Sequence, residues 1–168
     1  MNTDNQQERL NFDIGWLVGV WESEGWVSLR SCYLDGDRLQ RYRPEMGVGN
    51  TDAVLLDNVE RVLKQLHIPY WRTKWQTFEH KKSRATIKID GVKRCKQFLD
   101  ILGPLFVSKS DRVQIVKNFI DYRLSLPGKA PYSDKEHDWF FALSQLNAPL
   151  SKQVQNPQRL YVKANSLA

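Results

Sequence analysis

The sequence predicts an α+β fold in which helices cover one face of a four-stranded antiparallel sheet, and three observations support this prediction. First, residues 26–49 and 70–90 each contain two runs that alternate polar and apolar side chains, which is the pattern of a β-hairpin. Second, an amphipathic helical pattern over 51–66 separates the two hairpins. Third, one helix precedes the first hairpin and three follow the second, so the predicted order is α-β-β-α-β-β-α-α-α.

The size and composition of the chain restrict what it can be. It has 168 residues, and its 25 Lys and Arg exceed its 19 Asp and Glu, which gives a formal net charge of +6. We expect one core domain over residues 1–125, followed by a helical extension and tail over 126–168. No apolar run is long enough to span a bilayer, the N-terminus is polar, and two cysteines are too few for a disulfide scaffold. These features predict an intracellular protein, in the cytoplasm of a prokaryote or in an organelle, with an acidic partner such as nucleic acid.

The first helix is predicted over residues 12–22, with Gly25 as its stop. Gly15 and Gly19 are four residues apart and therefore share one face of this helix. A glycine costs about 1 kcal/mol in a helix interior. Two glycines on one face therefore predict that another backbone approaches closely there.

The first hairpin is predicted from strands at 26–34 and 38–49, joined by a turn at 35–37. Pro44 lies within the second strand and indicates an edge or a bulge at that point. One face of this strand carries charged residues and the other carries apolar ones: Arg41, Arg43 and Glu45 against Tyr42, Met46 and Val48. An arginine-rich face is hard to explain as core, so we expect it to be free for a ligand.

The second helix is expected to begin at a cap formed by Asn50 or Thr51 and to end near Leu66. Its predicted buried stripe is Val54 or Leu55, Val59, Val62, Leu63 and Leu66. The second hairpin follows, with strands at 70–78 and 83–90. Residues 70–96 hold nine basic residues against two acidic ones, interleaved with aromatic residues, and this mixture favours a nucleic-acid-binding face over a merely solvated one.

Three helices complete the predicted fold, over residues 92–102, 110–124 and 133–146. The first of them ends at Gly103-Pro104, and the last begins with the capping box that Ser133 and Glu136 form.

Two carboxylates stand at the end of the first helix, where the helix dipole disfavours negative charge. Each of Glu22 and Glu24 costs about 0.3–1 kcal/mol there unless a cation compensates. A lysine from elsewhere in the chain would compensate, and so would a divalent metal ion bound through hard oxygen ligands. These residues alone leave both explanations open.

The segment Leu17–Gly25, with the letters LVGVWESEG, resembles the nine-residue motif of the LAGLIDADG homing endonucleases. It keeps the first leucine, the central glycine, both acidic positions and the last glycine. It departs from the motif at Val18, Trp21 and Ser23, and it has Glu for Asp at both acidic positions. The order of elements predicted above is also that of the family, so the resemblance covers about residues 10–125 and implies an αββαββα core. The helix predicted over 133–146 is then an extra C-terminal helix.

The resemblance implies roles for individual residues. Glu24 is implied to bind the catalytic Mg²⁺ or Mn²⁺, Asn50 to order the attacking water, and Lys109 to lie near the scissile phosphate. A basic residue that relatives carry early in the second helix is missing here, because Val54 stands near that position. Two motif helices are implied to pack together in a homodimer through Gly15, Leu17, Val18, Gly19 and Glu22.

The implied activity is metal-dependent, site-specific cleavage of both DNA strands, which leaves short 3′ overhangs at a long pseudo-palindromic site. Only one copy of the motif is present, so two chains are needed to cut two strands, and the gene is implied to lie within an intron. We expect the sheet to contact DNA through Ser28, Arg30, Arg41, Arg43, Arg72, Lys74, Arg84, Thr86 and Lys88. About half of these should contact only phosphates.

Two other functions are compatible with the same fold. An RNA-binding splicing maturase would not need the acid at position 24, and its presence favours the nuclease. A DNA-binding regulator would bind without metal-dependent turnover, although the helices at 92–146 do not form a convincing helix-turn-helix.

Overall fold

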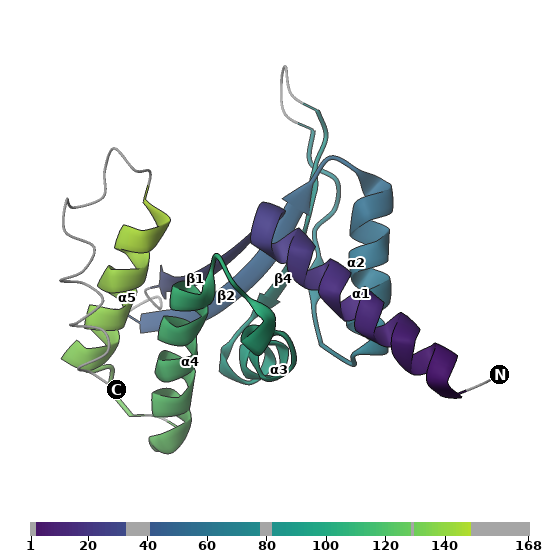
Figure 1. The fold of residues 1–168 in the computed structure, drawn as a ribbon. Coiled ribbons are helices and arrows are strands. Elements are labelled where there is room, and N and C mark those ends of the chain that lie inside the picture. The colour runs from purple at the N-terminus through teal and green to yellow at the C-terminus, as the bar shows by residue number, and fades with distance from the viewer. Residues whose placement is uncertain (1–2, 33–40, 78–81, 129, 149–168) are drawn as a thin grey trace.

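The computed structural model describes residues 3–32, 41–77, 82–128 and 130–148. Figure 1 shows the elements, which are α1 (Thr3–Glu24), β1 (Gly25–Cys32), β2 (Arg41–Asn50), α2 (Ala53–Gln65), β3 (Trp71–Arg72), β4 (Ala85–Asp90), α3 (Val92–Leu102), the 3₁₀ turn η1 (Gly103–Leu105), α4 (Ser110–Ser125) and α5 (Asp134–Asn147). This order confirms the prediction and adds the 3₁₀ turn. The turn predicted at 35–37, together with Arg38 and residues 78–81, lies outside the described residues.

The four strands form one antiparallel sheet in the order β1-β2-β4-β3. Side chains along β4 alternate between buried and half-buried, and Tyr42, Met46 and Val48 of β2 are buried as predicted. The helices lie along the side of the sheet that these apolar residues face (Figure 1). We call the opposite side, which carries the charged residues, the outer face.

Pro44 stands in an inner strand, where a proline is unusual. It pairs with Leu29 of β1, but the ladder between β2 and β4 begins only at Glu45. The carbonyl oxygen of Pro44 instead accepts a hydrogen bond from the backbone N–H of Gly91. The nitrogen and the carbonyl oxygen of one strand residue point to the same side, so both groups of Pro44 face away from β1. The β4 ladder does not extend to this point, so the missing N–H of Pro44 costs no ladder bond. The strand is locally an edge here, which is one of the two predicted alternatives.

The fourth strand is much shorter than predicted. The strand expected over 70–78 is reduced to Trp71–Arg72 and an isolated bridge between Gln76 and Arg84. Thr73 explains the interruption, because its hydroxyl oxygen accepts the N–H of Thr86 that would otherwise serve the ladder. The pairing then resumes with one extra residue on the β3 side, which is a β-bulge.

Helix α1 is longer than predicted, because it begins at Thr3 rather than near residue 12. Residues 5–9 are polar and exposed, and they carry no apolar stripe that a sequence pattern could detect. Their Gln, Glu and Arg residues are good helix formers, which accounts for the extension. The second half of α1 enters the core, where Trp21 is fully buried against Phe98 with ring centroids 4.9 Å apart.

Helix α2 begins at Ala53, one or two residues later than predicted, and its cap is Asp52 rather than Asn50 or Thr51. The Asp52 carboxylate accepts the backbone N–H groups of Val54 and Leu55. The buried residues are Leu56, Val59, Val62 and Leu63. Val54 and Leu66 therefore do not belong to the fully buried stripe, since Val54 is 68% exposed and Leu66 is half-buried.

Helix α5 packs on β1, β2 and α4 and braces the end of the first hairpin. The predicted capping box is present, with Glu136 accepting from the backbone N–H of Ser133. Trp139 is buried in the same core as the sheet, and His137 shares a hydrogen bond with the hydroxyl group of Tyr42. Beyond residue 125, the described helix α5 therefore supports the sheet from the side of the core.

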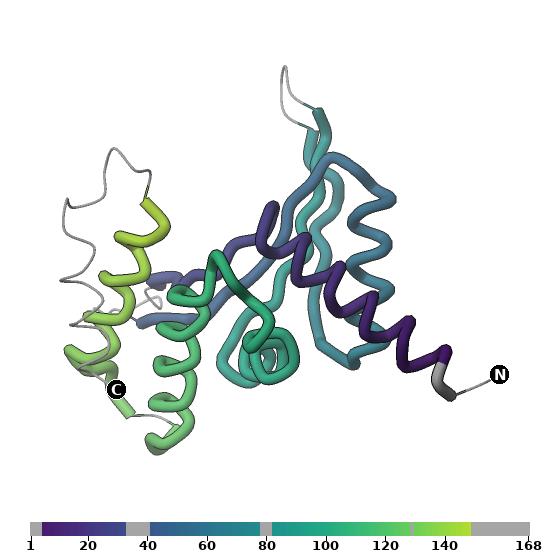
Figure 2. The backbone as a smooth tube through the Cα atoms, in the orientation of Figure 1, coloured from purple at the N-terminus to yellow at the C-terminus, as the bar shows by residue number. Residues whose placement is uncertain are grey.

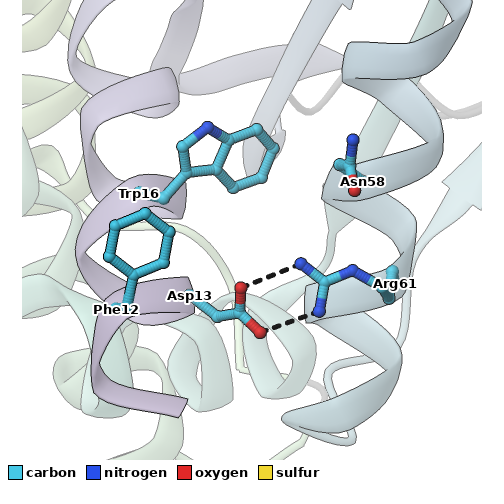
Figure 3. A pocket seen from close by; sticks show the side chains of 5 residues that line it. All are labelled: Phe12, Asp13, Trp16, Asn58 and Arg61. Carbon is cyan, nitrogen blue, oxygen red and sulfur yellow. Dashed lines mark hydrogen bonds and ion pairs between the residues drawn. The ribbon is translucent and has the colours of Figure 1, made fainter. Parts of the chain in front are cut away.

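An ion pair joins α1 to α2 in a pocket lined by Phe12, Asp13, Trp16, Asn58 and Arg61 (Figure 3). The Arg61 guanidinium donates to both carboxylate oxygens of Asp13, at 2.7 and 2.8 Å, and Asp13 is only 5% exposed. The hydrogen bonds from Arg61 lower the pKa of the Asp13 carboxyl, although burial opposes this. The pair therefore fixes the crossing of α1 over α2.

This ion pair predicts a loss of stability in acid. Because the pKa of Asp13 is lower in the folded than in the unfolded protein, its contribution is present above pH ~3.8 and is lost as the pH falls through the folded value. Replacing Asp13→Asn should lower the free energy of unfolding at pH 7 by about 1–3 kcal/mol. Urea titrations from neutral to acidic pH should show a shallower pH dependence for the variant. Asp100→Asn, which alters an exposed pair with Lys96, is the matched control; an equal loss in both would contradict the prediction.

Candidate active site and nucleic-acid interface

The residues proposed for catalysis meet where α1 ends and the sheet begins. Glu24 is the last residue of α1, and Gly25, which follows it, pairs with Val48 of β2. Asn50 is two residues further along β2, so it stands at the same end of the sheet. The ammonium of Lys109, just before α4, reaches this junction, and Figure 2 traces the loop between α3 and α4.

Lys109 caps the C-terminal end of α1. Its ammonium donates to the carbonyl oxygens of Trp21, Glu22 and Gly25, at 2.6, 2.7 and 2.7 Å. Burial lowers the pKa of Lys109, while the nearby charge of Glu22 acts to raise it. Of the two explanations left open for the acidic helix end, the structure shows a lysine at the helix carbonyls.

Glu22 is held in return by the loop before α4. The backbone N–H groups of Val107 and Ser108 donate to one carboxylate oxygen, and the Ser108 hydroxyl donates to the other. Burial works against ionisation, yet these hydrogen bonds lower the pKa of Glu22 below its ordinary value. Glu22 and Lys109 thus form a reciprocal clamp between the end of α1 and the start of α4.

Glu24 differs from Glu22 in having no such partner. It is exposed, and no hydrogen bond or ion pair to its carboxylate occurs within the described part of the chain. The described residues also contain no group of three His, Cys, Asp or Glu that could hold a metal ion by itself. A single free carboxylate still suits Mg²⁺, which is commonly held by one or two carboxylates, substrate phosphates and water.

Asn50 lies at the end of β2 with its side chain partly engaged. Its amide oxygen accepts the backbone N–H of Asp52, which fixes the turn into α2. The structure therefore brings Asn50, Glu24 and Lys109 to one end of the sheet.

Most of the residues predicted to contact DNA share the outer face. Ser28 and Arg30 of β1 pair in register with Glu45 and Arg43 of β2, and paired residues point to the same side of a sheet. The residues of the predicted set that the strands place on the outer face are Ser28, Arg30, Arg41, Arg43, Thr86 and Lys88. Arg84 lies two residues before Thr86, so the alternation of β4 places it on the outer face as well. Lys74 is exposed but lies outside the strands.

Arg72 is not on this face. It pairs in register with Ile87, which is fully buried under the helices. Its guanidinium donates to Asp57 at 2.6 Å and to Glu60 at 3.3 Å, both on α2, and these contacts raise its pKa. The prediction that Arg72 joins the outer face is therefore wrong, because the one-residue alternation of the short β3 turns it toward α2.

Two acidic residues lie among the basic side chains of the outer face. Glu45 is 3.5 Å from Lys88 and 4.0 Å from Arg30, and Asp90 is 3.1 Å from Arg43. The alternation of β2 placed Glu45 on this face, but the position of Asp90 follows only from the pairing of β4 with β2. The basic groups are thus held in defined positions before any ligand binds.

The exposed face of α1 differs from the predicted dimer contact. Leu17 is fully buried in the chain's own core and Val18 nearly so, so neither can form the surface that meets a partner. Gly15 and Gly19 are exposed, and an added Cβ at either would meet no atom of the described chain within 4 Å. Phe12, 73% exposed and on the same face by its spacing, is a candidate contact that the sequence reading missed.

Comparison with solved structures identifies the fold. No model of a known protein family matches the sequence, and no curated protein matches it. The archaeal intron-encoded homing endonuclease I-Vdi141I, complexed with DNA, has a TM-score of 0.66 at 11% identity, over 94% of this chain and 97% of that chain. The homing endonuclease I-CvuI, in complex with its target in the presence of Ca, has a TM-score of 0.64 at 13% identity, over 95% and 96%. The homing endonuclease I-TnaI has a TM-score of 0.55 at 11% identity, over 92% and 97%.

Together with the strand order, these matches define an α+β protein with helices on one face of a four-stranded antiparallel sheet. The protein has the LAGLIDADG homing endonuclease fold, as the segment at 17–25 predicted. None of the helices in the described part of the chain is long and apolar enough to cross a membrane.

Proposed function

We propose that the protein is a site-specific DNA endonuclease that hydrolyses phosphodiester bonds with Mg²⁺ or Mn²⁺, in the cytoplasm of a prokaryote or in an organelle. The observation that carries the proposal is the contrast at the end of α1. Both carboxylate oxygens of Glu22 accept hydrogen bonds, whereas Glu24, beside the basic outer face, is exposed and makes no hydrogen bond or ion pair among the described residues. A fold shared with DNA-bound homing endonucleases supports this assignment.

The chain's own residues would contribute in distinct ways. Glu24 would hold the divalent metal, which when bound activates water and stabilises the leaving oxygen. Asn50 would orient water at the same end of the sheet. The Lys109 ammonium donates three hydrogen bonds to backbone carbonyl groups. We therefore assign it chiefly to positioning the helix end that carries Glu24. Direct contact of Lys109 with a phosphate would require it to release one of these carbonyls.

We further propose that two chains form a homodimer through α1 and recognise a long pseudo-palindromic site. Each chain supplies one Glu24, and a duplex has two strands to cut. The open face of α1, with Gly15 and Gly19, allows a second backbone to approach closely. Cutting by two such sites would leave short 3′ overhangs.

The dimer proposal predicts that Gly19→Gln makes the protein monomeric. Because a Cβ at Gly19 meets nothing within 4 Å among the described residues of its own chain, we expect the added side chain to obstruct a partner instead. Replacing a helical glycine should leave the fold as stable or stabilise it by up to about 1 kcal/mol. Analytical ultracentrifugation should find the mass of one 19.7 kDa chain for the variant and twice that for the wild type. Gly128→Gln, at an equally open position after α4, should stay dimeric; a dimeric Gly19→Gln would refute the proposal.

The test of the proposed function is cleavage of DNA by the purified protein. A plasmid carrying the protein's own intron-insertion junction, or a duplex selected from a random pool, is incubated with Mg²⁺, with Mn²⁺ or with EDTA. We expect linear plasmid with either metal and none with EDTA, and sequencing of the ends should map 3′ overhangs. Tight binding without cutting in any metal would contradict the nuclease and favour a regulator, and tight binding to the intron RNA alone would favour a splicing maturase.

A further inference from the structure

An aromatic row crosses the outer face next to the candidate active site. The strand registers place Trp26, Gly47, Lys88 and Trp71 side by side, one from each of the four strands. Trp71 is 40% exposed although it is a large apolar residue. The row therefore presents two indole rings on a face whose other side chains are polar or charged.

Specific contacts with Gly47 and Lys88 hold the two indole rings in place. An added Cβ at Gly47 would lie 2.5 Å from the Trp26 ring and 2.6 Å from the carbonyl oxygen of Ile87, so only glycine allows the ring to lie across β2. The Lys88 ammonium is 5.8 Å from the Trp26 ring centroid and 5.3 Å from that of Trp71. It is also 3.5 Å from Glu45, so its charge is compensated within the face and the row is less suited to a phosphate.

The row and the arginines occupy different stretches of the sheet. Trp26 is two residues from Glu24, whereas Arg30 and its register partner Arg43 are four residues further along β1. Four strand residues span about 13 Å. That distance corresponds to about four base pairs. On a bound duplex the indole rings would therefore face base pairs close to the cleaved phosphate, and the arginines would face more distant ones.

We propose that Trp26 and Trp71 read the 5-methyl groups of thymine in the base pairs beside the cleavage position. This inference rests on the proposed endonuclease function and assigns part of its sequence preference. In the major groove the thymine methyl is the base feature that apolar side chains recognise, whereas arginine selects guanine through paired hydrogen bonds. The half-site should therefore be A·T-rich near the cut and contain guanine where Arg30 and Arg43 lie.

The test removes single methyl groups from the DNA. A preferred duplex is selected from a random pool by the wild-type protein without divalent metal, and each thymine is then replaced in turn by deoxyuridine. Binding should weaken about fourfold per methyl removed at the innermost thymines. It should be unchanged at thymines elsewhere in the site.

Variants then connect the methyl groups to the rings. Trp71→Ala, on the short edge strand, should bind thymine and deoxyuridine duplexes equally at those positions, and Trp26→Ala should do the same if circular dichroism shows it folded. Trp75→Ala is the matched control, because Trp75 is exposed to a similar extent, at 42%, but lies outside the row. Its ring lies against the guanidinium of Arg72, which forms ion pairs with α2 on the helix side of the sheet. It should keep the wild-type preference for thymine.

The outcomes separate this inference from the function on which it rests. The selected duplex could lack thymine at the innermost positions, or deoxyuridine there could leave binding unchanged. Either result would overturn the proposal that Trp26 and Trp71 recognise thymine methyl groups and would leave the endonuclease proposal intact. A deoxyuridine penalty that persists in Trp71→Ala and in folded Trp26→Ala would overturn it as well. Failure to select any duplex would instead contradict the proposed function, and the inference with it.

Discussion

Glu24→Gln should reduce DNA cleavage about 10³-fold or more, while stability and DNA affinity remain close to those of the wild type. The carboxylate is exposed and makes no hydrogen bond or ion pair within the described residues, so an isosteric amide should change the free energy of unfolding by no more than about 0.5 kcal/mol. We therefore expect the rate of metal-dependent cleavage to fall while metal-independent DNA binding is unchanged. Single-turnover cleavage in Mg²⁺, binding measured in EDTA and thermal denaturation together test this expectation.

Glu22→Gln is the matched control, since it makes the same change two residues earlier. An amide in place of this carboxylate loses the charge that the donors of Val107 and Ser108 stabilise, and it turns an NH₂ group toward one of them. We expect a loss of about 1–3 kcal/mol in the free energy of unfolding. Cleavage that survives in Glu24→Gln, or that is lost equally in both variants, would contradict the assignment of the metal to Glu24.

Local sequence patterns were sufficient to predict most of the fold. Strand alternation placed Tyr42, Met46 and Val48 in the core and Arg41 and Arg43 on the opposite face, because a side chain's face follows from its position along a strand. The capping box at Ser133 is likewise a local signal and is present. The start of α2 differs from the prediction because Asn50, Thr51 and Asp52 can each cap a helix, and Asp52 does so here.

Contacts between distant segments could not be read from such patterns. The side of the sheet on which Arg72 lies depends on a bulge at Thr73 and on acids of α2, and no periodicity within 70–78 encodes either. Leu17 and Val18 belong to a motif that implies a dimer contact, yet they fill the core of their own chain. For Glu22 and Glu24 the sequence showed only that a cation was needed. The structure distinguishes them: Glu22 is held by a loop more than eighty residues away, whereas Glu24 makes no hydrogen bond or ion pair within the described residues.

The Lys109→Met variant should unfold more easily, by about 2–4 kcal/mol, because three carbonyl groups at the end of α1 lose a charged donor. Glu22 would also lose the positive charge beside it, which loosens both halves of the clamp. Lys93→Met, at an exposed position on α3, is the control and should change stability by no more than about 0.5 kcal/mol. Urea denaturation measures both. A residue that served only to stabilise charge on the phosphate would behave differently: Lys109→Met would then match Lys93→Met in stability and lose cleavage alone, and that result would remove Lys109 from the positioning role.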